Sequence, residues 1–246
     1  MTASKHAFPP IATNTLSVQL AKRLVRQIIN GELVSGAVFP SDSELARQFD
    51  VSRAVIREAV KEVAVLGLLD RRQGRETRVA PRDSWRQLSP EVLAARTELG
   101  DADEAMLELL ELRRIVELEA AALAARRARD SDIAEMRRLL ELMDRQTEAP
   151  GSFIETDISF HIAILAATRN QLIVPLFQQL RPLLLFGRRL SVAKQPDMAI
   201  AAQRGHRAIF DAITDRSPER ARDQMAEHLS WTANLSFSQR ELRSWD

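Results

Sequence analysis

The chain of 246 residues is 45 % hydrophobic and 28 % charged, a composition typical of a globular protein with room for two cores. Its longest apolar runs fall far short of the roughly 20 residues of a membrane-spanning helix, and the absence of cysteine excludes disulfides and thiolate metal sites. Residues 1–82 hold thirteen Lys or Arg against eight Asp or Glu, and the remainder is net acidic, which predicts a nucleic-acid-binding module at the N-terminal end.

The N-terminal end predicts a short tail followed by a helix. Residues 1–13 contain Pro9-Pro10 and no helical periodicity, which predicts a disordered tail. They also lack the apolar segment of a secretory signal, so we expect a cytoplasmic protein without a membrane partner. Over residues 16–28 leucine and isoleucine recur every four residues, and Asn30-Gly31 is a typical helix end.

Residues 41–63 predict two short helices joined by a tight turn. Ser41 or Asp42 can cap the first helix, which runs to Phe49, because a side-chain oxygen satisfies the free N–H groups of its first turn. Ser52 can cap the second helix, whose apolar residues recur at spacings of three and four. Together the two helices predict a helix-turn-helix.

The first turns of the second helix carry Arg53 and Arg57 on one face. This end of a recognition helix enters the major groove, where guanidinium groups reach phosphates or guanine edges. Taken alone, both arginines are better explained as solvated charges. The flanks favour DNA binding, because strands predicted at residues 69–72 and 77–80 bracket Gly74 and form a basic two-stranded wing.

These segments resemble the winged-helix domain of the GntR family of bacterial repressors over residues 18–79. The resemblance rests on Gly31-Glu32-Leu33, Gly36, Pro40-Ser41-Asp42-Ser43-Glu44-Leu45-Ala46, Val51-Ser52-Arg53, Val55-Ile56-Arg57-Glu58-Ala59 and Gly67-Leu68-Leu69. It implies that Arg53 and Arg57 contact double-stranded operator DNA and that Ser52 contacts phosphate. It also implies that Gly74 lets the wing approach the minor groove.

Two positions on the expected DNA-binding surface depart from the family. The family usually has an arginine at the position of Ser43 and often a glycine at that of Glu76. The chain thus loses one cation and gains one anion at this surface. Because each phosphate contact contributes a salt-dependent term, we expect the affinity or the operator sequence to change.

The rest of the chain predicts a linker and an antiparallel helical bundle. Pro81 and the polar residues after it indicate a linker over residues 81–100, with a short helix at 90–96. Later periodicity is helical throughout, and the predicted helices cover residues 103–129, 131–147, 152–168, 171–190, 197–215 and 218–239. We therefore predict a mostly α-helical protein, with a winged helix-turn-helix domain at residues 14–80 and an all-α bundle at 101–240.

Three of the four histidines lie on predicted inward faces of this bundle. Asp157 and His161 are four residues apart on one helix, so their side chains project together, whereas His206 and His228 lie on two other helices. Each histidine alone is better explained as a hydrogen-bonded core residue. One divalent cation, however, would satisfy all three imidazoles and the carboxylate. The set suits Zn²⁺, our preferred metal, or Ni²⁺ or Mn²⁺, with positions open for water or ligand oxygens.

The histidine pattern extends the resemblance to the C-terminal FCD ligand-binding domain of FadR-type GntR regulators, over residues 103–238. It rests on Asp157-x-x-x-His161, Asn170, Gly205-His206-x-x-Ile209 and Met225-x-x-His228-Leu229, with Glu111-x-Arg113 and Glu117 upstream. It implies that Asp157, His161, His206 and His228 hold a metal and that a small carboxylate effector completes its coordination. Members that bind acyl-CoA lack this set, which argues against a fatty-acyl effector.

Two further residues are candidates for effector binding. Arg113 lies on a predicted buried stripe and needs an anionic partner, either a bound carboxylate or Glu117 one turn on. Asn170 stands at a helix start, either as a cap, which we favour, or as a ligand that reads a hydroxyl group. The linker resembles that of regulators of sugar-acid catabolism at Val79-Ala80-Pro81-Arg82, Trp85, Leu88 and Glu91-Val92-Leu93. This favours an aldonate or uronate effector.

The sequence therefore predicts a homodimeric, ligand-responsive transcription regulator that is not an enzyme: a repressor of a catabolic operon, released from DNA by a small organic acid. Effector and metal would stabilise one arrangement of the bundle and so control DNA binding by population shift. A second hypothesis is a metal-dependent hydrolase fused to a DNA-binding module, which would need a general base beside the bound water. In a third, the metal is purely structural and the bundle serves only dimerisation.

Overall fold

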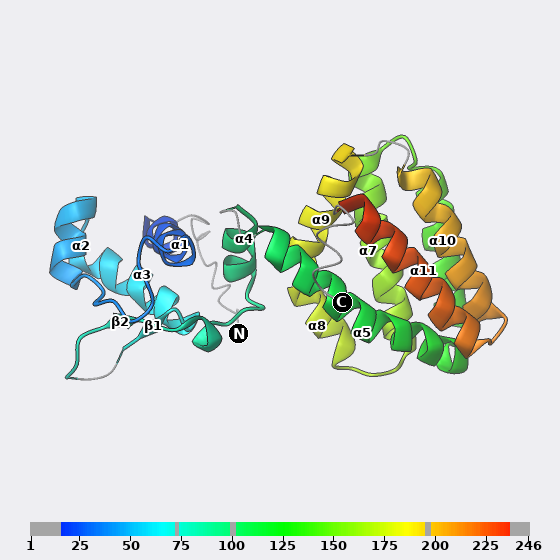
Figure 1. Ribbon diagram of the computed structural model, residues 1–246, viewed down its shortest axis with the longest axis horizontal. Helices are drawn as coiled ribbons and strands as arrows, with labels where there is room; N and C mark the ends of the chain where they lie inside the picture. Colours follow the sequence, from blue (N-terminus) through cyan, green and yellow to red (C-terminus); the bar gives the residue numbers. More distant parts are fainter. Residues whose placement is uncertain (1–15, 72–73, 99–101, 195–197, 237–246) are drawn as a thin grey trace, which may run out of the picture. The chain divides into compact units, whose positions relative to one another are not determined.

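The computed structural model describes residues 16–71, 74–98, 102–194 and 198–236, and the tail predicted at residues 1–13 lies outside them. The chain divides into two compact units, residues 1–95 and 96–246. The described residues contain eleven α-helices and a two-stranded antiparallel sheet (Figure 1). The predicted class, mostly α-helical with a winged helix-turn-helix and a helical bundle, is confirmed.

The first unit is built from three helices and a small sheet. Its elements are α1 (Leu16–Ile29), α2 (Asp42–Phe49), α3 (Arg53–Val65), β1 (Leu69–Asp70), β2 (Arg78–Val79) and the 3₁₀ turn η1 (Arg82–Ser84). The core is formed by apolar stripes of α1 and α3, in which Leu24 and Ile56 are almost fully buried. Each such side chain contributes about 1.5–3 kcal/mol to folding. These stripes hold α3 by its inner face and leave its first turns exposed.

Local signals set the ends of α2 and α3. Ser41 and Glu44 form a capping box, in which Glu44 N donates to Ser41 Oγ at 3.3 Å and Ser41 N donates to Glu44 Oε2 at 2.9 Å. Asp50 ends α2 in the left-handed conformation with φ of 52°. Ser52 caps α3, because its Oγ accepts from Val55 N at 3.4 Å. The tight turn between these caps makes the helix-turn-helix.

The wing strands pair antiparallel, with Leu69 opposite Val79 and Asp70 opposite Arg78. They are shorter than predicted, and Leu69 and Val79 are their buried residues. The chain enters β1 through Gly67, whose φ is +78°. A Cβ at this position would lie 2.3 Å from the carbonyl oxygen of Ser84, so only glycine fits. The wing is thereby fixed at its base and extends from it.

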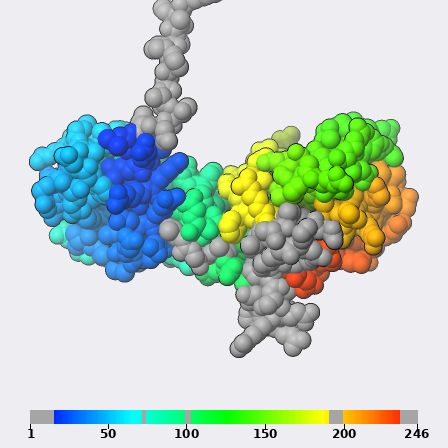
Figure 2. All heavy atoms as spheres, turned by 90° about the horizontal axis from the view of Figure 1, so that it is seen from above, coloured from blue at the N-terminus to red at the C-terminus, as the bar shows by residue number. Residues whose placement is uncertain are grey.

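The second unit is an antiparallel helical bundle. Helix α4 (Pro90–Glu98) precedes the bundle helices α5 (Ala102–Arg127), α6 (Asp130–Asp144), α7 (Pro150–Ala167), α8 (Ile173–Gln179), α9 (Arg181–Lys194), α10 (Met198–Thr214) and α11 (Pro218–Ser236). The long α5 packs along α11 and α7 (Figure 1). On the face shown in Figure 2, α10 lies between α6 and α11. Small residues of α5, such as Ala121 and Ala125, allow these helices to approach closely around Phe153 and Phe160.

One helix prediction is wrong. The single helix expected over residues 171–190 is two helices, α8 and α9, which are separated at Leu180. Pro182 explains the break, because it has no N–H to donate to the carbonyl of Gln178 and its ring clashes with that carbonyl.

Among the helices of the described residues, none is both long enough and apolar enough to cross a membrane.

Candidate functional site

Four buried side chains meet inside the second unit. Asp157 and His161 come from α7, His206 from α10 and His228 from α11, and one nitrogen or oxygen atom of each lies within 4.8 Å of the others. None is more than 4 % exposed. The imidazole centroids of His206 and His228 are 4.5 Å apart, and that of His161 is 5.3 Å from that of His228. The structure thus brings together the four residues that the sequence named as metal ligands.

Close approach of α10 and α11 depends on Gly205, which precedes His206. A Cβ at Gly205 would lie 2.6 Å from Nδ1 of His228. Because glycine has no side chain, the ring of His228 can pack directly against α10. Asp157 and His161 come together without such a glycine, because both lie on α7 and residues four apart on a helix project from the same side.

Hydrogen bonds orient two of the three imidazoles. Gln203 Nε2 donates to the carbonyl of Leu140 at 2.8 Å and to Oδ1 of Asp144 at 2.9 Å, so the amide oxygen of Gln203 faces His206. That oxygen lies 3.1 Å from His206 Nδ1, which must therefore carry the proton. His161 Nδ1 lies 2.5 Å from Oε2 of Glu117, which orients this ring in the same way.

This arrangement leaves the lone pair of one imidazole nitrogen beside a carboxylate oxygen. With its proton on Nδ1, His206 presents an unprotonated Nε2 at 3.1 Å from Oδ1 of Asp157, without the alignment of a hydrogen bond. His228 Nε2 is also buried and has no hydrogen-bond partner among the described residues. An unprotonated imidazole nitrogen and a carboxylate oxygen at this distance repel each other unless a cation lies between them. The donor set of three imidazoles and one carboxylate therefore fits a divalent cation.

The surroundings of Asp157, His206 and His228 keep these three side chains in the forms that bind metal. Burial lowers the pKa of His206 and holds that of His228 well below its usual range, so both imidazoles are neutral at pH 7. Burial opposes ionisation of Asp157, but the charge of Arg188 outweighs it and holds the pKa of this carboxyl well below its usual range. Neutral imidazoles and an ionised carboxylate are what a metal site requires.

Two buried arginines lie beside the cluster. Arg188 Nε donates to Oδ2 of Asp157 at 2.7 Å, and its Nη2 lies 3.4 Å from Nε2 of His161. Arg113 Nε donates to Oε1 of Glu117 at 2.5 Å, so of its two expected partners the structure contains the glutamate. Burial raises the pKa of Glu117, but Arg113 and then His161 lower it to about 2.

Two small hollows adjoin these arginines. Both are lined by Arg113, Leu184 and Arg188; Glu117, Asp157 and His161 also line the first, and Met106 and Thr232 the second. Their volumes are about 10 and 20 Å³, room for roughly one water each. An organic acid therefore requires side chains to move. Asn170 lines neither hollow; it is exposed, and its Oδ1 accepts from Leu172 N at 3.0 Å in the turn before α8.

Sequence reasoning missed two residues of this site. Arg188 follows the apolar run Leu183–Phe186, and a cation at the end of such a run was a signal of a buried charge. Gln203 gave no such signal, because a glutamine three residues before a histidine is common on any helix surface.

The predicted DNA-binding residues lie in the first unit. Ser43, Arg53 and Arg57 line a hollow between α2, α3 and the wing. Ser52 and Gly74 do not line it. The hydroxyl of Ser52 caps α3, and Gly74, with φ of +76°, has open space around its Cα.

Residues 16–79 match the family described as bacterial regulatory proteins, gntR family, and residues 108–230 match the FCD domain. The galactonate operon transcriptional repressor of Escherichia coli K12 is 31 % identical over 80 % of this chain and 86 % of its own length. The Glc operon transcriptional activator of the same strain is 29 % identical over 85 % of this chain and 84 % of its own length. LutR of Bacillus subtilis 168, an HTH-type transcriptional regulator, is 30 % identical over 82 % of this chain and 93 % of its own length.

Among solved structures, the Listeria monocytogenes protein Lar, described as controlling the agr system, is similar in fold. The TM-score is 0.64 at 18 % identity, over 93 % of this chain and 100 % of that one.

Proposed function

Because the chain belongs to the GntR family of bacterial regulatory proteins and carries an FCD domain, we propose that it is a repressor of a catabolic operon, released by a small organic acid bound at a metal. The family establishes a ligand-responsive DNA-binding transcription regulator. What we propose beyond the family is that the protein binds a metal, that a small organic acid is its effector, that it acts as a repressor and that it is a homodimer. The buried cluster of one aspartate and three histidines carries it.

In this proposal Asp157, His161, His206 and His228 hold the metal, with Zn²⁺ preferred over Ni²⁺ or Mn²⁺. The support is that Nε2 of His206 and Nε2 of His228 have no hydrogen-bond partner among the residues the structure describes, and that both rings are neutral. When bound, a divalent cation supplies an electropositive coordination position for an anionic oxygen. Glu117 and Gln203 orient the ligands from behind.

The proposed effector is a sugar acid. Arg113 and Arg188 are buried cations next to the cluster, and a carboxylate is the group that such a pair binds best. The resemblance to a galactonate operon repressor favours an aldonate over other organic acids. Because the hollows hold only about one water each, the effector carboxylate would have to draw Arg188 away from Asp157. Movement of Arg188 would then couple effector binding to the packing of α9 against α7.

Thermal stabilisation by a panel of organic acids tests this function. Protein loaded with Zn²⁺ is expected to be stabilised by galactonate, gluconate or a uronate, and the same acid should release the protein from DNA. Metal-free protein and the Arg188→Gln variant should show much smaller shifts. If no acid of the panel stabilises the loaded protein, the metal serves structure alone. If an acid stabilises it and strengthens DNA binding, release from DNA by the effector is refuted.

Replacement of Gly205 by alanine is expected to weaken metal binding about 10- to 100-fold, the cost typical of disturbing the support of a metal ligand. The new Cβ would meet His228 Nδ1 at 2.6 Å and push this ring from its place. Competition with a chromophoric chelator measures the affinity. Gly151→Ala is the matched control, because a Cβ at that helical position meets nothing within 4 Å. Equal affinity of both variants would show that the position of His228 is not needed.

The hydrolase hypothesis finds no suitable general base among the described side chains of the cluster. The two carboxylates at the cluster are both engaged: Glu117 by Arg113 and His161, and Asp157 by Arg188. With a pKa of about 2, Glu117 is a weak base. We therefore propose that the protein is not an enzyme, and conversion of a sugar acid by the purified metal-loaded protein would contradict this.

A further inference from the structure

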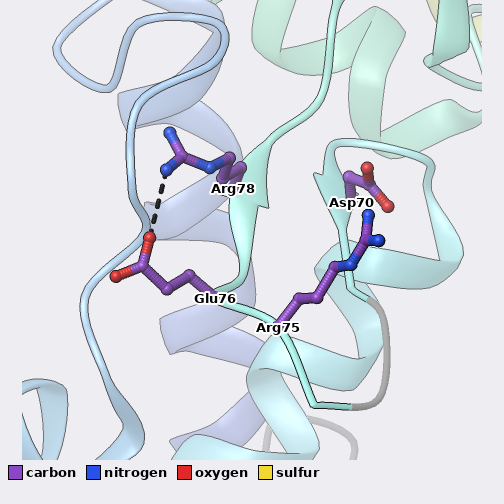
Figure 3. A pocket seen from close by; sticks show the side chains of 4 residues that line it. All are labelled: Asp70, Arg75, Glu76 and Arg78. Atoms are coloured by element: carbon purple, nitrogen blue, oxygen red, sulfur yellow. Dashed lines mark hydrogen bonds and ion pairs between the residues drawn. The ribbon is translucent and has the colours of Figure 1, made fainter.

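Two arginines of the wing, Arg75 and Arg78, are directed toward acidic side chains of the wing itself (Figure 3). Arg78 Nη2 lies 3.1 Å from Oε2 of Glu76, and its Nη1 donates to the carbonyl of Gly36 at 2.8 Å. Figure 3 shows this pair and also shows the side chain of Arg75 directed toward Asp70 on β1. Glu76 and Arg78 are more than half exposed, so their pairing occurs on the surface.

The hollow between the wing and the helix-turn-helix carries acids and bases in equal number. Its basic residues are Arg53, Arg57 and Arg71, and its acidic residues are Asp42, Glu44 and Glu76. Arg57 Nε lies 3.4 Å from Oδ2 of Asp42. DNA-binding surfaces ordinarily carry a basic excess, because affinity comes largely from cations that neutralise phosphates. The side chains lining this hollow supply no such excess.

Glu76 is placed to weaken the part of the affinity that carries no sequence information. Non-specific binding consists almost entirely of contacts between cations and phosphates. Exposed ion pairs are weak, so a phosphate can compete for Arg78. The Glu76 carboxylate nevertheless remains beside the guanidinium and repels the incoming phosphate. The guanidinium of Arg53 is exposed at the start of α3. Among the described residues, no contact of the wing brings a carboxylate beside it.

We propose that Glu76 is a specificity-determining residue, which suppresses binding to non-operator DNA by neutralising Arg78. The proposal rests on DNA binding by the first unit. On non-operator DNA the protein samples many registers and takes those in which a free guanidinium meets a phosphate. On an operator, base contacts of α3 fix one register, so a guanidinium freed from Glu76 gains less. Glu76 therefore widens the ratio between operator and non-operator affinity.

Glu76→Gln tests the proposal on a mixed-sequence 30-base-pair duplex and on an operator selected from random DNA. One additional phosphate contact makes the salt slope of log K steeper by about 0.9, which corresponds to roughly eightfold tighter binding to the mixed duplex at 0.1 M salt. The selected operator is expected to gain less. Fluorescence anisotropy at several salt concentrations measures both quantities.

Two variants separate the proposed cause from a general charge effect. Glu32→Gln removes the same charge from the same unit at a residue that contacts Gln27 and Asn30 and does not line the hollow, so it should change the slope little. Glu76→Gln combined with Arg78→Gln should return the slope to that of the wild type. Equal salt slopes for Glu76→Gln and Glu32→Gln would overturn the proposal. So would a double variant that keeps the gain in affinity for the mixed duplex. Failure of the wild type to bind either duplex would instead refute DNA binding itself.

Discussion

Simultaneous replacement of Arg53 and Arg57 by alanine is expected to abolish operator binding while both units stay folded. Both side chains are exposed on the outer face of α3, whereas Ile56 and Val63 hold its inner face in the core. Truncation therefore removes no packing. Each arginine that reaches a base edge or a phosphate contributes about 1–3 kcal/mol, so the double variant should bind roughly 30- to 3 × 10⁴-fold more weakly.

The matched control removes two other cations of the same unit. Lys22 on α1 and Lys61 on α3 are exposed, and neither lines the hollow between the wing and the helix-turn-helix. Lys22→Ala with Lys61→Ala should lower affinity only through the change in net charge. Circular dichroism and metal content establish that each variant is folded. Normal gel shifts by the Arg53 and Arg57 double variant would remove the assignment of α3 as the recognition helix.

The second large effect is expected at the metal cluster. Replacement of His206 by glutamine removes one of the four proposed ligands and should weaken metal binding by more than the 10- to 100-fold typical of losing an outer partner. In the wild type, metal at 100 times its dissociation constant stabilises the folded state by about 2.7 kcal/mol. For a chain of this size that corresponds to an increase of roughly 5–10 °C in melting temperature. His206→Gln should lose this increase.

The chelator-treated wild type keeps this prediction testable if the variant folds poorly. Removal of metal with EDTA should lower the melting temperature of the wild type, and added Zn²⁺ should restore it. Elemental analysis of the purified proteins gives the metal content directly. A wild type that contains no metal, and whose melting temperature does not respond to Zn²⁺, Ni²⁺ or Mn²⁺, would contradict the metal site.

Local features of the sequence determined much of the fold. The caps at Ser41 and Ser52 and the helical periodicity of the later chain each depend on neighbours within one or two turns, so pattern reasoning could locate them. The break between α8 and α9 also has a local cause, Pro182. Within the site, only the pairing of Asp157 with His161 followed from spacing alone.

The tertiary structure decided the rest of the site, because its contacts join residues far apart in the chain. Glu117 and His161 are 44 positions apart, and Asp157 and Arg188 are 31 apart. Whether such residues meet depends on how α5, α7, α9, α10 and α11 pack, and packing reflects the shapes of all the side chains between them. The sequence could therefore name four candidate metal ligands, but only the folded bundle shows that they converge and that Arg188 lies beside them.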